Sequence, residues 1–324
     1  MSDLEVVRFF GLRCAAFDKD VDEQDLWTPQ ERVSLMERIT ESLRARQHVL
    51  LCGEPGLGKS CMLRAVRRAL PEAKFPMTYL HNATLGRRDF YRQICVGLGL
   101  TPKATAAALF HEVSCWVMLR SRDGVHPVFI IDEAQMLRDE MLGHLHVLAN
   151  YEWDQKPLLS LVLAGLPDLR IRLERPLHRS LYSRIFCRIE LPEAGATETR
   201  EYVQHRLQRA GAKEGIFPDE AMLAIHERAG GSLRDIDRLA GTAMAQAAAR
   251  RVKTIDAAMI RAVHELDRPR TSCRHRPVSA AKQARVELPA STYLNIRTVH
   301  QMDPLNVNPD HQHCALKYLS AGGR

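Results

Sequence analysis

A glycine-rich turn between a largely apolar run and a helix-forming run constrains this chain more than any other feature. The turn matches the pattern Gly-x4-Gly-Lys-Ser and follows residues 48–52. Glycines let backbone N–H groups turn inward around phosphate oxygens, and the helix that follows adds the positive end of its dipole. The pattern therefore predicts a nucleotide-binding P-loop. The residues expected to contact the nucleotide are Gly53, Glu54, Pro55, Gly56, Leu57, Gly58, Lys59, Ser60 and Cys61.

Two side chains of this turn carry its expected chemistry. Lys59 is expected to reach the β- and γ-phosphates of ATP, and the Ser60 hydroxyl is expected to ligate Mg²⁺. The alternative is a glycine turn that holds no ligand. The buried strand before it and the helix after it are the context that a P-loop requires, so they favour the nucleotide site.

A second apolar run, residues 128–131, ends in two carboxylates. Asp132 is expected to hold the Mg²⁺ shell, and Glu133 is expected to orient and polarise the attacking water. Alone, such a run usually means a strand that meets solvent. On another strand of the sheet that carries a P-loop, it predicts hydrolysis of ATP.

Apolar runs and helical stretches alternate along the first part of the chain, which predicts an α/β fold. A helix is expected from residue 28 to about 46, with Thr28 and Glu31 as a capping box, and another from 59 to 70. We expect a P-loop NTPase parallel sheet with helices on both faces. Its expected strands are 48–52, 77–80, 128–131, 158–164 and 186–191.

The pattern changes after Pro192, where helical stretches follow one another with no strand between them. They predict a small all-helical lid domain, and beyond it the chain loses its apolar periodicity. The expected helices are 198–210, 218–229, 232–250 and 255–266. The expected division is an N-terminal segment packing near the nucleotide (1–27), the ATPase core (28–193), the lid (194–267) and a basic, disordered tail (268–324).

Composition and charge narrow the class of protein. The chain has no apolar run of transmembrane length, and its first residues lack the basic and apolar regions of a signal peptide. The eight cysteines form no Cys-x-x-Cys pair, which indicates reduced thiols. These features predict a cytoplasmic protein without a membrane partner. Most of the net charge of +7 belongs to residues 268–324, so charge gives weak support for a nucleic-acid surface on the folded part.

Several segments together resemble the ExeA-like branch of AAA+ ATPases, over about residues 8–267. That branch includes a secretion-pathway ATPase and ATP-binding transposition helper proteins similar to TniB, IstB and MuB. The segments that carry the resemblance are 10–12 (Phe-Gly-Leu) with Phe17, 131–137 (Ile-Asp-Glu-Ala-Gln-Met-Leu), 148–154 and 163–169 (Leu-Ala-Gly-Leu-Pro-Asp-Leu).

The resemblance implies roles for two arginines. Arg234 looks like sensor 2, a lid arginine that reaches the γ-phosphate. Arg184 stands where the family carries an arginine finger that completes the site of a neighbouring subunit, and Arg179 and Arg188 are the alternatives. Otherwise each is a surface or salt-bridged arginine. The expected catalytic residues are therefore Lys59, Glu133, Arg184 and Arg234.

One position departs from the family. Relatives often have a polar residue, usually Gln, in the turn after the fourth strand, where this chain has Leu166. Leucine cannot hydrogen-bond to water or phosphate. Either a neighbour such as Ser160 takes over this sensor 1 role, or hydrolysis is slow.

The resemblance implies a DNA-transposition helper as the first functional hypothesis. ATP would drive assembly of a homo-oligomer on duplex DNA, and the assembly would deliver target DNA to a transposase. Arg87 and Arg88 are the expected DNA contacts, with a solvated basic turn as the alternative. A secretion or envelope-assembly ATPase is the second hypothesis; it is expected to need a transmembrane helix and a periplasmic domain that the tail does not accommodate. A nucleotide-dependent signalling switch is the third.

Overall fold

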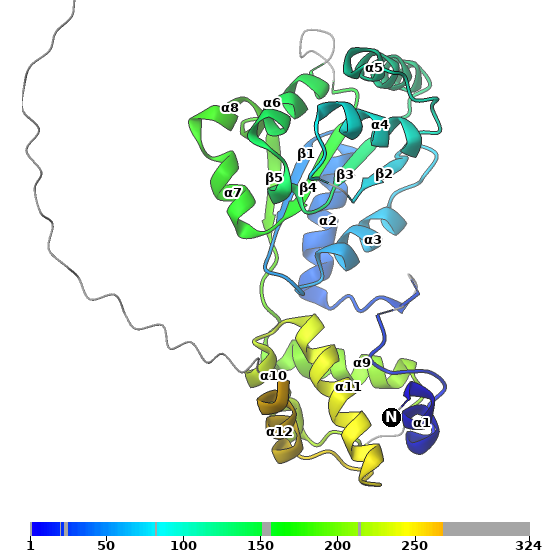
Figure 1. The fold of residues 1–324 in the computed structure, drawn as a ribbon, viewed down its shortest axis with the longest axis vertical. Coiled ribbons are helices and arrows are strands. Elements are labelled where there is room, and N and C mark those ends of the chain that lie inside the picture. Colours follow the sequence, from blue (N-terminus) through cyan, green and yellow to red (C-terminus); the bar gives the residue numbers. More distant parts are fainter. Residues whose placement is uncertain are drawn as a thin grey trace, which may run out of the picture. The chain divides into compact units, whose positions relative to one another are not determined.

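Five parallel strands form the centre of the computed structural model of this chain (Figure 1). They lie in the order β2-β3-β4-β1-β5, and every neighbouring pair is parallel. The predicted parallel sheet is confirmed. The strands are β1 (His48–Cys52), β2 (Met77–Leu80), β3 (Val128–Ile131), β4 (Ser160–Gly165) and β5 (Ile185–Glu190).

The structure describes residues 2–19, 21–22, 25–81, 83–150, 157–212 and 215–267. Residues Met1–Arg270 form one compact unit. The predicted tail, 268–324, and most of the family segment 148–154 lie outside the described residues.

Helices cover both faces of the sheet, as the alternating sequence pattern predicts. On β1, Val49 and Leu51 point into the apolar cluster with α2 (Gln30–Arg44) and α3 (Lys59–Ala69). Leu50 and Cys52 point into the cluster on the opposite face. The helices of that opposite face are α4 (Arg87–Gly97), α5 (Ala106–Arg122) and α6 (Asp139–Leu148). Burial on both faces explains why β1, β3 and β4 read as largely apolar runs, whereas the edge strand β5 alternates between buried and exposed residues.

Short helices connect the ends of the central strands. After β3 comes the 3-10 turn η2 (Ala134–Met136), and after β4 come α7 (Pro167–Leu173), η4 (Pro176–His178) and α8 (Arg179–Tyr182). At the start of α2 the prediction was wrong about the cap. The N-cap is Pro29 and no side chain caps the helix, so Thr28 forms no capping box with Glu31.

In the described part of the chain after β5, four helices share an apolar core of their own. Small side chains such as Ala243 and Ala247 of the third helix are fully buried, which allows neighbouring helices to approach closely. The helical region expected after Pro192 is therefore present. The helices are α9 (Ala196–Arg209), α10 (Asp219–Ala229), α11 (Leu233–Ala249) and α12 (Ala257–Asp267).

The N-terminal segment contains a helix, α1 (Asp3–Phe10), that was not predicted. Its signals were short but present: the Ser2 N–H donates to the Glu5 carboxylate at 2.9 Å, and Gly11 ends the helix at a φ of 69°. The segment packs on the apolar core of the four C-terminal helices. It also reaches the P-loop helix, where Nη2 of Arg64 donates to the Val21 carbonyl at 2.6 Å.

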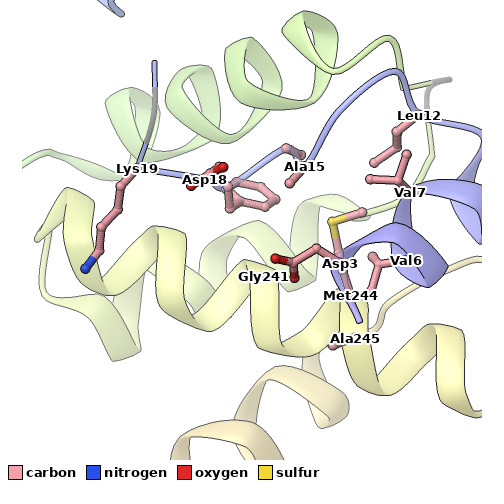
Figure 2. A pocket seen from close by; sticks show the side chains of 12 residues that line it. Asp3, Val6, Val7, Leu12, Ala15, Asp18, Lys19, Gly241, Met244 and Ala245 are labelled. Atoms are coloured by element: carbon pink, nitrogen blue, oxygen red, sulfur yellow. The ribbon is translucent and has the colours of Figure 1, made fainter. Parts of the chain in front are cut away.

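A cavity of about 310 Å³ lies between this segment and α11. Val6, Val7 and Leu12 line one side of it, and Met244 and Ala245 line the other (Figure 2). No P-loop residue lines this cavity. Among the residues that the structure describes, no helix is long and apolar enough to cross a membrane.

Candidate nucleotide-binding site

The P-loop follows the carboxyl end of β1 and opens directly into α3. Gly56 and Gly58 have φ angles of 85° and 92°, a region that L side chains rarely adopt. A Cβ on Gly56 would lie 2.5 Å from Oγ of Ser232. The N–H groups in the first turn of a helix have no intrahelical partner, and no side chain caps α3. These groups can therefore bind an anion.

Lys59 lies buried beneath this loop. Its Nζ donates to the carbonyl oxygens of Gly53 at 2.7 Å and of Glu54 at 3.1 Å. Burial lowers the pKa of Lys59, while the carboxylates of Glu133 and Asp132 oppose that shift. The ammonium is therefore held by neutral carbonyl oxygens. Charged phosphate oxygens can replace them, because a charged acceptor makes a stronger hydrogen bond.

Asp132 directly follows β3 and is buried. Its Oδ2 accepts a hydrogen bond from Oγ of Ser60 at 3.5 Å, and its Oδ1 accepts one from the Glu133 N–H at 2.9 Å. A hydroxyl and a carboxylate are the hard oxygen donors that Mg²⁺ prefers, and both are here beside the P-loop. The residues present therefore fit the cation, with Ser60 and Asp132 as the donors.

Tyr79 is a member of this site that the sequence analysis missed. Its phenolic hydroxyl donates to Oδ2 of Asp132 at 2.5 Å. Partial burial and then this hydrogen bond raise its pKa, while 49% of the residue stays exposed. The side chain comes from β2, which pairs with β3 so that Tyr79 stands opposite Ile130. A tyrosine near the carboxyl end of the neighbouring strand was the available signal, but the strand order had to be known to use it.

Glu133 has a left-handed backbone with a φ of 51°, which is uncommon for a residue other than glycine. Its side chain is exposed, and its Oε2 accepts a hydrogen bond from Nε2 of Gln135 at 2.6 Å. Oε1 of Gln135 accepts one from the Leu166 N–H at 3.2 Å. The predicted catalytic carboxylate is thus connected to the turn after β4.

Arg234 reaches the P-loop from the first turn of α11. Its N–H donates to the Gly56 carbonyl at 3.3 Å, and a Cβ on Gly56 would lie 2.9 Å from its own Cβ. A cation near a helix N-terminus is disfavoured by about 0.3–1 kcal/mol. Helix stability therefore does not account for an arginine at this position.

Arg32 is a second residue that the sequence analysis missed. It is only 5% exposed, and its Nη1 donates to the Leu57 carbonyl of the P-loop at 2.6 Å. Its Nε lies 3.8 Å from Oε1 of Glu198 on α9. Burial lowers its pKa, and Glu198 opposes that shift. The signal was an arginine on the face of α2 that also buries Ile39 and Leu43.

Arg184 is not brought to the nucleotide site of its own chain. It precedes Ile185, which pairs with the first residue of β1, whereas the P-loop follows the last. Its Nη1 donates to the Ser180 carbonyl at 2.9 Å. Of the two alternatives, Arg188 lies 3.9 Å over the ring of Tyr182, and Arg179 is exposed at the start of α8.

Ser160 is wrong as a replacement for Leu166. It is fully buried at the start of β4, and its Oγ lies 2.8 Å from Nε2 of His126. The strands are parallel, so this end of the sheet is opposite the P-loop. Arg87 and Arg88, the predicted DNA contacts, are the exposed first two residues of α4, and their role stays a prediction.

A family model described as an AAA domain matches residues 41–173. General secretion pathway protein A of Aeromonas hydrophila is 32% identical over 246 residues, which cover 75% of this chain and 45% of that protein. A putative lon protease homolog of Methanothermobacter thermautotrophicus is 38% identical over 66 residues, 19% of this chain and 13% of that protein. The chain spans less than half the length of these curated relatives.

Solved structures share the fold at low sequence identity. Cdc6p from Pyrobaculum aerophilum matches with a TM-score of 0.59 and 17% identity, covering 72% of this chain and 68% of that chain. The Aeropyrum pernix ORC1 protein in complex with DNA matches with a TM-score of 0.58 and 19% identity, covering 78% of this chain and 68% of that chain. The Thermotoga maritima RuvB Holliday junction branch migration motor matches with a TM-score of 0.51 and 20% identity, covering 78% of this chain and 72% of that chain.

These three similarities concern the fold alone, because the sequence identities are low. The AAA domain match covers the P-loop and the Asp132–Glu133 pair, and the similarity to General secretion pathway protein A extends over three quarters of the chain. Together these findings show a P-loop fold that contains an AAA domain and is similar to General secretion pathway protein A over three quarters of the chain.

Proposed function

We propose that this chain binds ATP together with Mg²⁺ and hydrolyses it. The observation that carries the proposal is the convergence of the P-loop with a strand-end carboxylate pair. Oγ of Ser60 lies 3.5 Å from Oδ2 of Asp132, and the charges of Glu133 and Asp132 act on the buried Lys59. A solitary glycine turn gives no reason for this arrangement.

Each side chain has a part in the proposed reaction. Lys59 and the N–H groups of the first turn of α3 hold the phosphates, and Ser60 and Asp132 hold the cation. A cation held by these two residues would supply charge neutralisation for the phosphates. Glu133 orients the attacking water, and Arg234 adds positive charge from the helical region. Cys61 and the rest of residues 53–60 supply backbone contacts.

The chain works as an assembly of its own copies in this proposal. Arg184 lies outside the site of its own chain, so its action on ATP is in trans, on the site of a neighbouring copy. A guanidinium supplied in this way stabilises charge on the transferring phosphoryl group and makes turnover depend on assembly. Arg179 and Arg188 are the alternatives.

Duplex DNA and a transposase are the further partners that we propose for a transposition helper. Support comes from the exposed Arg87 and Arg88 at the start of α4, and from the fold shared with an ORC1 protein in complex with DNA and with RuvB, a Holliday junction motor. In this function the ATP-bound assembly on DNA matters more than rapid turnover.

A secretion-type function is the second candidate, and a specific observation favours it. General secretion pathway protein A is 32% identical over three quarters of this chain. In that function the assembly forms without DNA, and Arg87 and Arg88 are ordinary surface residues.

Measuring ATP turnover and sedimentation, each with and without duplex DNA, tests these proposals. We expect Mg²⁺-dependent turnover and a larger species when ATP and DNA are both present. A matched variant, R87A/R88A, should keep basal turnover and lose the DNA effect. Assembly and turnover that ignore DNA would contradict the transposition function and favour the secretion type. Absence of any ATP turnover would contradict the ATPase itself.

A further inference from the structure

The side chain of Gln135 spans the distance between the end of β4 and the catalytic carboxylate. Its Oε1 accepts the Leu166 N–H at 3.2 Å, and its Nε2 donates to Oε2 of Glu133 at 2.6 Å. An amide has one acceptor oxygen and one donor nitrogen, so this pairing uses both ends of the group and fixes which way it points.

The surroundings of Gln135 are built to hold it there. A Cβ on Gly165 would lie 2.6 Å from Oε1 of Gln135, so the close approach depends on glycine at that position. Arg172 of α7 fastens the turn by donating to the Gln135 carbonyl at 2.6 Å and to the Leu137 carbonyl at 2.8 Å. Backbone and side chain of Gln135 are therefore both fixed by contacts from the segment after β4.

The contact matters because Glu133 has little other support. Among the described residues, Nε2 of Gln135 is the one hydrogen-bond donor to its carboxylate. The contact occupies Oε2 and leaves Oε1 to accept a proton from water. A base that is held at one oxygen presents the other in a defined direction, and small errors of placement cost about 100-fold in rate.

We propose that Gln135 is the positioning residue for Glu133. Its amide links the Leu166 backbone, at the end of the neighbouring strand, to the Glu133 carboxylate. This inference rests on the proposed ATP hydrolysis and specifies how its water-orienting carboxylate is held.

The test compares kcat with the dissociation constant for ATP in Q135M and Q135E. Q135M keeps the length and removes both hydrogen bonds, and Q135E keeps an acceptor for Leu166 but places a second carboxylate beside Glu133. We expect kcat to fall about 10- to 100-fold in both, with ATP affinity within about twofold of the wild type. Q204A, an exposed glutamine on α9, is the matched control and should leave both values unchanged.

The same comparison in an E133Q background separates positioning from a structural role. If Gln135 acts through Glu133, Q135M should lower single-turnover hydrolysis by less than about twofold in that background, because the group it positions is gone. G165A should reproduce the kcat loss by displacing the amide, whereas G143A, which has open space around its Cβ, should not.

Two results distinguish the ways of failing. If the wild type turns over ATP and Q135M retains its kcat, or if Q135M costs as much without Glu133 as with it, the positioning inference is overturned and the ATPase stands. If the wild type binds ATP and Mg²⁺ but hydrolyses none, the proposed function fails and this inference fails with it.

Discussion

The phenolic oxygen of Tyr79 lies 2.5 Å from the same carboxylate oxygen of Asp132 that the Ser60 hydroxyl approaches at 3.5 Å. The proposed Mg²⁺ ligand Asp132 is therefore oriented by a side chain from the neighbouring strand β2. Groups that hydrogen-bond to a metal ligand fix its orientation, and their loss commonly costs about 10- to 100-fold in metal affinity.

Replacement of Tyr79 by phenylalanine should raise the Mg²⁺ concentration that gives half-maximal ATP turnover by about tenfold. The affinity for ATP without the cation should not change. A Mg²⁺ titration of turnover measures the effect. Y182F is the matched control, because that phenol donates to the surface carboxylate of Glu174, and its Mg²⁺ dependence should equal the wild type. Equal curves for Y79F and wild type would remove Tyr79 from the cation site.

Replacement of Lys59 by alanine should abolish ATP binding, because its ammonium is the buried cation of the P-loop and already bonds to neutral carbonyls that phosphate would replace. Calorimetric titration with Mg²⁺–ATP measures this. The exposed Lys74 offers a control, and K74A should bind as the wild type does. Undiminished binding by K59A would mean that the nucleotide lies elsewhere.

Replacement of Arg184 by alanine should leave ATP binding intact and lower turnover by about 1000-fold, the scale of a lost arginine finger. Because Arg184 acts on the neighbouring copy in the proposal, mixing R184A with K59A should restore turnover. In such a mixture the K59A subunit supplies the arginine and the R184A subunit binds ATP. A mixture as inactive as its parents, or an R184A variant with normal turnover, would contradict Arg184 as the finger and leave Arg179 and Arg188 as the candidates.

Acid should destabilise the sheet through His126. Burial lowers the pKa of this histidine to about 4, and electrostatic interactions with Arg46 and His48 add to the shift. The unfolded chain, with an ordinary pKa near 6.5, binds a proton that the folded chain excludes between these values. Stability therefore falls as pH drops below about 6.5, by about 2 kcal/mol at pH 5.

Urea unfolding at pH 7.5 and pH 5 checks this expectation. H126Q should lose most of that pH dependence, and the exposed His111 provides the control in H111Q. An H126Q variant with the same pH dependence as the wild type would show that other groups carry the acid sensitivity.

The main elements of the fold could be predicted from local pattern alone. The runs 77–80 and 128–131 match β2 and β3 to the residue, because a proline precedes each run and a polar residue follows it. Only β3 is buried at every position; β2 lies at the edge of the sheet. Helix starts were harder: at α2 a proline takes the cap position that a capping-box pattern gave to Thr28. The cap depends on backbone angles that the pattern does not contain.

The site residues also differ in whether local sequence pattern alone could identify them. Lys59, Ser60, Asp132 and Glu133 could be named because each stands at a fixed position in a local motif. Tyr79 meets that motif only after β2 and β3 have been placed side by side. Gln135 lies two residues from Glu133 in the chain, but its contact with Leu166 depends on the pairing of β3 with β4.

The hydrogen bond from the Arg234 N–H to the Gly56 carbonyl has a practical consequence, because it joins the helical region to the P-loop through main-chain atoms. A change of the Arg234 side chain removes the charge and leaves this link in place. Only proline at that position lacks the donor. At a single codon the charge can therefore be removed while the main-chain link is kept, or both can be removed together.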